Sequence, residues 1–242
     1  MSQAAEKIAA LYDWRCSRGG STKDYEPFAA ADVTLLAGQT DFCTARLCDA
    51  GCGNGIHLRA LTDAGVNYPV GVDLSKESLR NLLATDLADS IILVNADFTT
   101  WRIGPIFHAV ICSLPVISEV EGYDLRTILS ALQSMTKQGG CILLKLFDSE
   151  RVQDITGTFS VIYDGTTSEK VSRISHAPGH RSIDISQHYA DTPHDTRRET
   201  IDTPTRDEVY LEAQAVGMRA KSIDHHMELP GTRTYLLRIS AE

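Results

Sequence analysis

The residue pattern that most directly suggests chemistry is an acidic residue followed by a turn with glycine at every second position. It runs Leu47-Cys48-Asp49-Ala50-Gly51-Cys52-Gly53-Asn54-Gly55. Because glycine lacks a Cβ and adopts positive φ angles, such a turn folds tightly and brings its backbone N–H groups close to a ligand. We interpret it as a nucleoside-cofactor loop in which Asp49, Gly51 and Gly53 bind the cofactor. The alternative is a purely structural turn.

Two further acidic residues follow apolar segments. Asp73 ends the segment 69–73, and Asp97 follows the segment 90–94. A carboxylate at the tip of the second strand of a doubly wound sheet accepts hydrogen bonds from ribose hydroxyls, so we predict that Asp73 binds a ribose. We expect Asp97 to accept a hydrogen bond from an adenine amino group and Phe98 to lie on the base. The alternatives are a turn-forming or helix-capping role for Asp97 and a core position for Phe98.

Short apolar runs define the elements that must position these residues. They predict strands at 45–49, 69–73, 90–94, 107–112 and 140–147, which alternate with helices as in a parallel sheet covered on both faces. Helices are expected at about 4–11, 25–37 and 206–215, and a terminal hairpin at 219–226 and 232–239. The predicted fold class is therefore α/β, a doubly wound (Rossmann-like), mostly parallel seven-stranded sheet.

The pattern changes to short polar strands with Gly, Pro, Asp and Thr turns between residues 156 and 203. Ligands bind beyond the carboxyl ends of parallel strands, and this segment leaves the fifth strand there, so we interpret it as an antiparallel β insert that forms a lid. The alternative is a decorative or dimer-forming sheet. We expect an N-terminal helical cap (1–40), a cofactor-binding α/β domain (41–155 and 204–242) and the lid insert (156–203).

Composition excludes several classes of partner. The 242 residues carry a formal net charge of -9. Because nucleic-acid binding requires clustered Lys and Arg, we expect no nucleic-acid partner and a small-molecule substrate instead. No basic region precedes an apolar stretch at the start and no run of eighteen apolar residues occurs, so we expect a cytoplasmic protein with no membrane partner. The six cysteines contain no C-x-x-C pair, and Cys43, Cys48 and Cys52 lack the spacing of a common zinc module. We expect no metal.

The G-x-G-x-G turn after Asp49 resembles motif I of class I S-adenosylmethionine (SAM) dependent methyltransferases. Other segments carry a narrower resemblance: Tyr12-Asp13, Gly19-Gly20, Lys23-Asp24-Tyr25, His57-Leu58, Gly71-Val72-Asp73-Leu74-Ser75, Phe107 to Cys112, Val171-Ser172-Arg173-Ile174-Ser175-His176, His188-Tyr189 and Gly231-Thr232-Arg233. These segments are similar to the N-methyltransferases that act on nucleotide-activated amino sugars. The resemblance extends over most of the chain, from about residue 9.

The resemblance implies SAM as the cofactor. Tyr12 and Tyr25 would close over its carboxylate end, and Leu74 and Cys112 are further expected cofactor contacts. On the acceptor side, the resemblance implies substrate contacts by Arg173, His176, His188 and Arg233, with Arg233 facing an anionic part of the acceptor.

The acceptor side also departs from the family pattern. Glu119 stands where the family has a histidine after the fourth strand, and Pro115 replaces a small polar residue. Lys145-Leu146-Phe147-Asp148 replaces an acidic, tryptophan-rich end of the fifth strand. We therefore expect a different acceptor pocket.

Three residues are candidates for catalysis: Glu119, His176 and Tyr12. SAM is reactive by itself, so the protein mainly aligns the reactants, excludes water and leaves the attacking amine unprotonated. Glu119 would bind the acceptor and take its proton, and His176 is the second candidate base. The alternatives are a solvated turn carboxylate for Glu119 and a packing role for His176.

The sequence thus predicts a SAM-dependent N-methyltransferase that acts on a small-molecule amine of specialised metabolism, with an amino sugar among the candidates. One alternative is an enzyme that consumes SAM without methylation, by an intramolecular displacement that releases methylthioadenosine. A SAM-sensing module without turnover is the other. The sequence leaves open whether the protein is a monomer or a homodimer.

Overall fold

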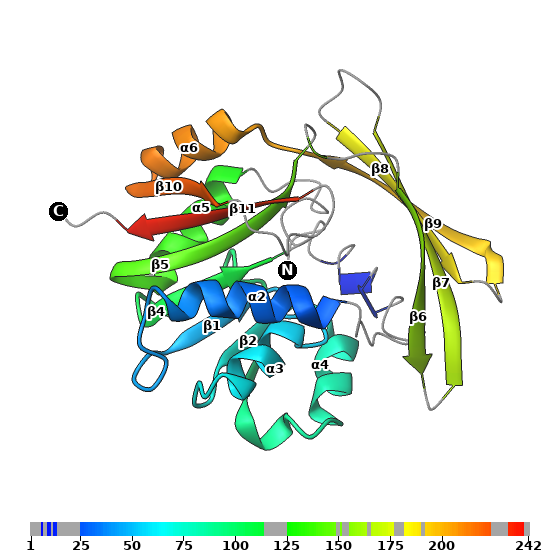
Figure 1. Cartoon of the computed structure of the whole chain (residues 1–242), viewed down its shortest axis with the longest axis horizontal. Helices are drawn as coiled ribbons and strands as arrows, with labels where there is room; N and C mark the ends of the chain where they lie inside the picture. The colour runs from blue at the N-terminus through cyan, green and yellow to red at the C-terminus, as the bar shows by residue number, and fades with distance from the viewer. Residues whose placement is uncertain are drawn as a thin grey trace.

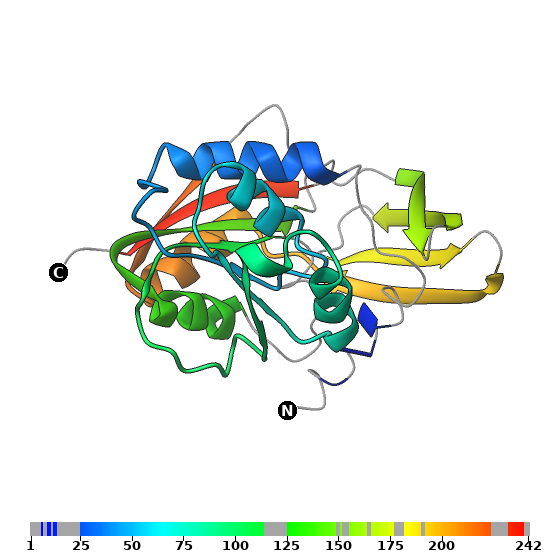
Figure 2. The same ribbon diagram turned by 90° about the horizontal axis from the view of Figure 1, so that it is seen from below.

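The computed structural model consists of two β-sheets and the helices that cover the larger one (Figures 1 and 2). It describes residues 6, 9–10, 12–13, 25–113, 125–148, 151, 155–163, 166–176, 182–189, 192–223 and 232–239. Within these residues, no helix is long and apolar enough to cross a membrane. Residues 6, 9–10 and 12–13 are helical, and the rest of the helix predicted at 4–11 lies outside the described residues.

The larger sheet has seven strands in the order β10-β11-β5-β4-β1-β2-β3. The strands are β1 (Leu47–Ala50), β2 (Val70–Asp73), β3 (Ile92–Asn95), β4 (Phe107–Cys112), β5 (Thr136–Phe147), β10 (Met218–Ile223) and β11 (Thr232–Ile239). Strands β1 to β5 are parallel, whereas β11 pairs antiparallel with both β5 and β10. The predicted fold class is confirmed, including the terminal hairpin.

Helices cover both faces of this sheet (Figure 2). They are α2 (Glu26–Ala37), α3 (Ile56–Asp63), α4 (Lys76–Leu83), α5 (Leu125–Met135) and α6 (Arg206–Ala215), together with the short 3-10 helix η2 (Ala88–Ser90). Helix α6 begins at a capping box, because the Thr205 side chain accepts from the backbone N–H of Glu208 and the Glu208 side chain accepts from the backbone N–H of Thr205. Its bounds are those predicted from the sequence.

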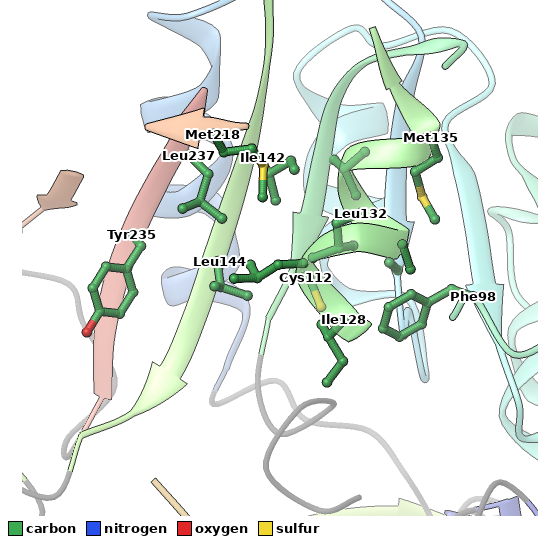
Figure 3. Packing of buried hydrophobic residues seen from close by; sticks show 14 of the residues in the cluster. Phe98, Cys112, Ile128, Leu132, Met135, Ile142, Leu144, Met218, Tyr235 and Leu237 are labelled. Atoms are coloured by element: carbon green, nitrogen blue, oxygen red, sulfur yellow. The ribbon is translucent and has the colours of Figure 1, made fainter. Parts of the chain in front are cut away.

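The side chains of β5 alternate between two cores. Ile142, Leu144 and Leu146 belong to the cluster that also holds Ile128 and Leu132 of α5 (Figure 3). Cys141 and Leu143, on the other side of the strand, belong to the cluster that holds α2 residues such as Val33 and Leu36. Both faces of the strand are therefore buried, which explains why the sequence of β5 is an apolar run rather than an alternation of apolar and polar residues.

The smaller sheet is the insert. Its four antiparallel strands are β6 (Ile155–Tyr163), β7 (Thr166–His176), β8 (Ser182–Tyr189) and β9 (Thr192–Asp202), in that order. Each strand is longer than the sequence pattern indicated. The sheet stands at the side of the molecule toward which β5 runs, beyond the carboxyl ends of the parallel strands (Figure 1).

Close packing of α3 on the sheet generates the first testable prediction. A Cβ at Gly71 of β2 would lie 2.6 Å from Leu58 Cδ1 and 2.8 Å from Cys52 Sγ. Gly71→Ala should therefore lower the free energy of unfolding by about 1–3 kcal/mol, as overpacking of a core does. Urea unfolding measures the change.

Gly38→Ala is the matched control, because its Cβ would meet only Leu35 O, at 3.5 Å. We expect that control to stay within about 0.5 kcal/mol of the wild type. Equal stability of the two variants would show that the contact between α3 and β2 is not close.

Candidate cofactor site

The glycine turn connects β1 to α3 at the carboxyl ends of the parallel strands. Gly51, Gly53 and Gly55 all have positive φ, of 80°, 49° and 75°. This backbone region favours glycine over residues with a side chain, so the alternate glycines match the alternate left-handed positions. The local pattern in the sequence is therefore explained by the backbone path of the turn.

Four backbone N–H groups of this turn donate hydrogen bonds within the protein. Gly51 and Cys52 donate to the carbonyl of Val72 at 2.8 and 3.1 Å, and Gly55 donates to that of Cys52 at 2.8 Å. The Gly53 N–H donates to Asp73 Oδ2 at 2.7 Å. A phosphate-binding loop keeps such groups for its ligand, so this turn is a poor phosphate cradle.

Asp73 anchors the turn to the end of β2. Besides the Gly53 N–H, its carboxylate accepts the N–H of Ser75 at 2.7 Å on Oδ1. Burial raises the pKa of Asp73, and these two backbone hydrogen bonds oppose the effect. Asn95 of β3 donates to the carbonyls of Asp73 and Leu74, each at 3.0 Å. Ribose binding by Asp73 stays a prediction, and the support that this carboxylate gives to the turn is a role that sequence reasoning missed.

Asp49 is the buried carboxylate at the carboxyl-end side of β1. Among the residues that the structure describes, its Oδ2 has no hydrogen-bond partner. Burial raises its pKa to about 6, the charge of His57 opposes this shift, and the charges of Asp73 and Asp32 reinforce it. A buried oxygen without a partner costs free energy, so this atom is poised to receive a donor or a positive charge from a ligand.

The other expected cofactor contacts lie on the neighbouring strand ends. Asp97 follows β3, and its Oδ1 accepts from the N–H and the hydroxyl of Thr99 at 2.9 and 2.6 Å, the geometry of a turn-forming aspartate. Phe98 packs in the core beside α5 (Figure 3) and is 8% exposed. Both positions agree with the structural alternatives, and adenine contacts by the two residues stay predictions. Leu74 is partly exposed after β2, whereas Cys112 is fully buried at the end of β4.

The N-terminal segment lies against the end of β2. Asp13 Oδ1 accepts from the hydroxyl of Ser75 at 2.6 Å and from the N–H of Glu77 at 3.2 Å, so it caps the start of α4 together with Ser75. Tyr12 is therefore carried to the same edge of the sheet, where it is partly buried. Tyr25 is the N-cap residue of α2 and is also partly buried. Contacts of the two tyrosines with a cofactor stay predictions.

On the predicted acceptor side, the structure brings Arg233 and Asp148 together. Asp148 directly follows β5, Arg233 is the second residue of β11, and Arg233 Nε donates to Asp148 Oδ2 in a buried ion pair. Arg151 donates to the carbonyl of Thr232 at 3.3 Å. The predicted acceptor residue Arg233 is thus held by a carboxylate at the ligand edge of the sheet.

The remaining acceptor residues are placed only by their strands. Arg173 and His176 lie on β7, opposite Ser186 and Ile183 of β8, and His188 lies on β8 with a partly buried side chain. Glu119, the main candidate base, lies outside the described residues, as does Pro115. The predicted catalytic contacts of Glu119, His176 and Tyr12 stay predictions.

A buried polar cluster next to the turn is absent from the sequence predictions. Asp32 of α2 contacts both Lys145 of β5 and His57 of α3. The sequence indicates this cluster only through Lys145, a charged residue inside the apolar run of β5, and Lys145 was interpreted from the sequence only as a departure from the family pattern.

A known protein family matches the part of the chain that contains the glycine turn. Residues 47–140, from β1 into β5, match the family described as "Methyltransferase domain". This stretch is similar to a methyltransferase domain. The glycine turn and the three strands that carry Asp49, Asp73 and Asp97 at or just after their ends all lie within the matched residues. The resemblance inferred from motif I is therefore confirmed.

Among curated proteins, the chain is similar to the dTDP-3-amino-3,6-dideoxy-alpha-D-glucopyranose N,N-dimethyltransferase of Streptomyces fradiae. The two are 29% identical over 174 residues, which are 71% of this chain and 65% of the relative. The match thus spans just under two thirds of that enzyme.

Solved structures share the fold over nearly the whole chain. A SAM-bound amino pentose methyltransferase from Micromonospora echinaspora, involved in calicheamicin biosynthesis, superposes with a TM-score of 0.69 at 21% identity, covering 99% of this chain and 98% of its own. DesVI of Streptomyces venezuelae also gives 0.69, at 20% identity, covering 96% and 98%. The antiparallel insert is part of the superposed length.

The raised pKa of Asp49 generates a pH-dependent prediction. The folded protein holds the proton up to about pH 6, whereas the ordinary carboxyl loses it near 3.8. The ionised form therefore destabilises the fold by an amount that grows between pH 4 and 6 and is complete above that range, at about 3 kcal/mol. Asp49→Asn should stabilise the ligand-free protein by about 1–3 kcal/mol at pH 7.5 and by close to nothing at pH 4.

Urea unfolding at a series of pH values measures this difference. Asp86→Asn is the control, because Asp86 is an exposed carboxylate paired with Arg59 away from the turn. A stability gain for Asp49→Asn that does not vary with pH would contradict the assignment.

Proposed function

We propose that this protein binds SAM and transfers its methyl group to the nitrogen of a small-molecule amine. The single observation that carries the proposal is Asp49: a buried carboxylate oxygen without a hydrogen-bond partner among the described residues, next to a glycine turn whose own N–H groups are already used. Such a site suits a nucleoside cofactor that brings positive charge. A dinucleotide would instead bring a negatively charged pyrophosphate.

The residues at the strand ends fit SAM chemically. Asp49, Asp73 and Asp97 place carboxylates at the ends of three neighbouring strands, which favours a cofactor with a sulfonium and an ammonium group. Asp73 has further acceptor capacity for ribose hydroxyls beyond its two backbone hydrogen bonds. Tyr12 and Tyr25 would cover the amino-acid end. SAM supplies an electrophilic methyl group when it is bound.

The rest of the chain would position the acceptor and exclude water. Transfer to an amine requires the unprotonated nitrogen, so the protein needs a group that takes or releases a proton beside it. Glu119 and His176 are the proposed candidates. The Arg233–Asp148 pair lies at the same edge and would present a fixed guanidinium to an acidic part of the acceptor.

Nitrogen as the attacking atom is supported by the Streptomyces fradiae relative, which is named an N,N-dimethyltransferase of an amino sugar, and the Micromonospora structure is named an amino pentose methyltransferase. An amino sugar of specialised metabolism is therefore the first acceptor to test. Among the replaced residues at the end of β5, Asp148 contacts Arg233, which argues for an acceptor that differs from theirs.

Product analysis tests this function. Purified protein is incubated with SAM alone and with SAM plus a panel of amino sugars and small amines, and the products are identified by mass. A methyltransferase releases S-adenosylhomocysteine only when an acceptor is present, because the methyl carbon otherwise has nowhere to go. Methylthioadenosine formed from SAM alone would instead reveal internal displacement and would overturn the proposal.

Asp73→Ala is the companion variant for the cofactor site. We expect its SAM affinity in calorimetry to fall at least tenfold, about 1.4 kcal/mol. Asp86→Ala removes the same charge from the exposed pair with Arg59 and should bind SAM like the wild type.

We also propose that the four-stranded sheet is the acceptor lid. The first strand of the insert starts and the last one ends at the same end of the sheet, because Ile155 pairs with Ile174, His176 with Ile183, and Ser182 with Asp202. Three strand spacings of about 4.8 Å separate these two points, so a linker of about six Gly/Ser residues bridges them. Replacing residues 155–202 with it should keep SAM binding and abolish turnover.

Calorimetry with SAM and the product assay measure the two effects in the same protein. Turnover that survives the deletion would show that the insert is not the acceptor lid. Loss of SAM binding as well would show that it belongs to the cofactor site.

A further inference from the structure

A lysine occupies a core position on β5. Alternate side chains of this strand face α2, and Cys141 and Leu143 pack there with Val33 of that helix. Lys145 is the next residue in the alternation and its side chain is 1% exposed. Two apolar side chains would fill the same space without the cost of removing charges from water, so packing alone does not explain a lysine here.

The charge of Lys145 is matched by a carboxylate. Its Nζ lies 2.7 Å from both Oδ1 and Oδ2 of Asp32, and Asp32 is equally buried on α2. Burial alone would raise the pKa of Asp32, but the hydrogen bond from His57 and the charge of Lys145 outweigh it and hold the pKa below its usual value. Asp32 is therefore ionised and acts only as an acceptor.

The same carboxylate orients a histidine. Asp32 Oδ2 lies 3.1 Å from His57 Nε2, and both side chains are buried. Because an ionised carboxylate cannot donate, the hydrogen of this contact must be on Nε2 of His57. The ion pair thus keeps a hydrogen on Nε2 and fixes the direction of the ring.

His57 is the second residue of α3, directly after the glycine turn. Gly55 is the N-cap of this helix in the left-handed region, and the turn is tied on its other side to Asp73 and Val72 of β2. His57 also contributes a charge interaction that lowers the pKa of Asp49, against the charges of Asp32 on α2 and Asp73 on β2. His57 therefore links the start of α3, directly after the turn, to Asp32 of α2.

We propose that Lys145, Asp32 and His57 are positioning residues for the cofactor turn: the buried ion pair fixes the His57 ring, and the ring holds the first turn of α3, and with it the glycine turn, in the geometry that binds SAM. The same contacts tie α2 to the turn, and α2 begins directly after Tyr25. This inference rests on the proposed binding of SAM, but the ordering of the turn is also observable without ligand.

Two variants break the connection between the ion pair and the turn, one at the ion pair and one at His57. Asp32→Leu combined with Lys145→Met replaces both charges by side chains of similar volume, so the core stays filled while His57 loses its acceptor. His57→Phe leaves the ion pair in place and removes the ring nitrogen. In both variants we expect faster hydrogen exchange of the amides at residues 53–58 and SAM affinity at least tenfold weaker in calorimetry.

A third variant restores only the hydrogen bond. Asp32→Asn combined with Lys145→Met has no charge at either position, but the amide oxygen can still accept from His57 Nε2. We expect exchange at residues 53–58 and SAM affinity closer to those of the wild type than in Asp32→Leu/Lys145→Met, because the acceptor for His57 is kept and only the charge is lost. Arg126→Met is the control: it also removes one cation of a pair, with Glu212, but it lies between α5 and α6.

The outcomes separate the two proposals. Wild-type exchange and affinity in both disrupting variants would overturn the positioning role, and so would a restoring variant as defective as Asp32→Leu/Lys145→Met. Altered exchange that follows the expected pattern in a protein that does not bind SAM would support the positioning role while it refutes the proposed function. His57→Phe keeps the test decisive if the charge-free variant fails to fold.

Discussion

The contact between the glycine turn and the end of β2 is the constraint on which the candidate site depends. Val72 accepts two N–H groups of the turn and Asp73 accepts a third, so the turn is held in place before any ligand arrives. Since these three donors are used within the protein, the carboxylate of Asp49, with an unpartnered Oδ2 among the described residues, is the group that the site offers to a ligand. A site built in this way selects for positive charge, and this is why a turn that resembles a dinucleotide loop serves a different cofactor.

Two buried carboxylates near this turn differ in their partners and in the direction of their pKa shifts. Asp32 is matched by Lys145 and hydrogen-bonded by His57, which keeps it ionised inside the core. Asp49 has no hydrogen bond to Oδ2 among the described residues, and its pKa is raised to about 6. The ion pair of Asp32 orders the protein. The ionised, unpartnered carboxylate of Asp49 costs folding free energy, and a cationic ligand would offset that cost.

The residues proposed for the cofactor and those proposed for the acceptor come from different parts of the chain. Residues 47–140, which match the methyltransferase domain, contain the turn and the acid-tipped strands. The proposed acceptor side comprises the end of β5, the start of β11 and the insert, all of which come later in the chain. The departures from the family pattern lie at the end of β5 and after β4: Asp148 contacts the proposed acceptor residue Arg233, whereas Lys145 is paired with Asp32 behind the cofactor turn.

The sequence by itself determined the elements that depend on local patterns. Apolar runs located the parallel strands, the helical pattern placed α6 at 206–215, and the alternate glycines marked the three left-handed positions of the turn. These features depend on residues a few positions apart, so they can be read without knowing the fold. The strands of the insert were predicted too short, because their polar sequence has little hydrophobic pattern.

Only the tertiary structure decided how the polar residues pair. Asp32 and Lys145 are 113 residues apart, and they meet because α2 packs on the face of β5 that Lys145 shares with Leu143. Asp73 was assigned to a ribose, whereas the fold shows that its carboxylate also holds the Gly53 N–H, 20 residues earlier in the chain. Arg233 was assigned to an acceptor, and the fold places it against Asp148. A charged side chain in a sequence does not reveal its partner, because the partner is chosen by the packing of distant elements against each other.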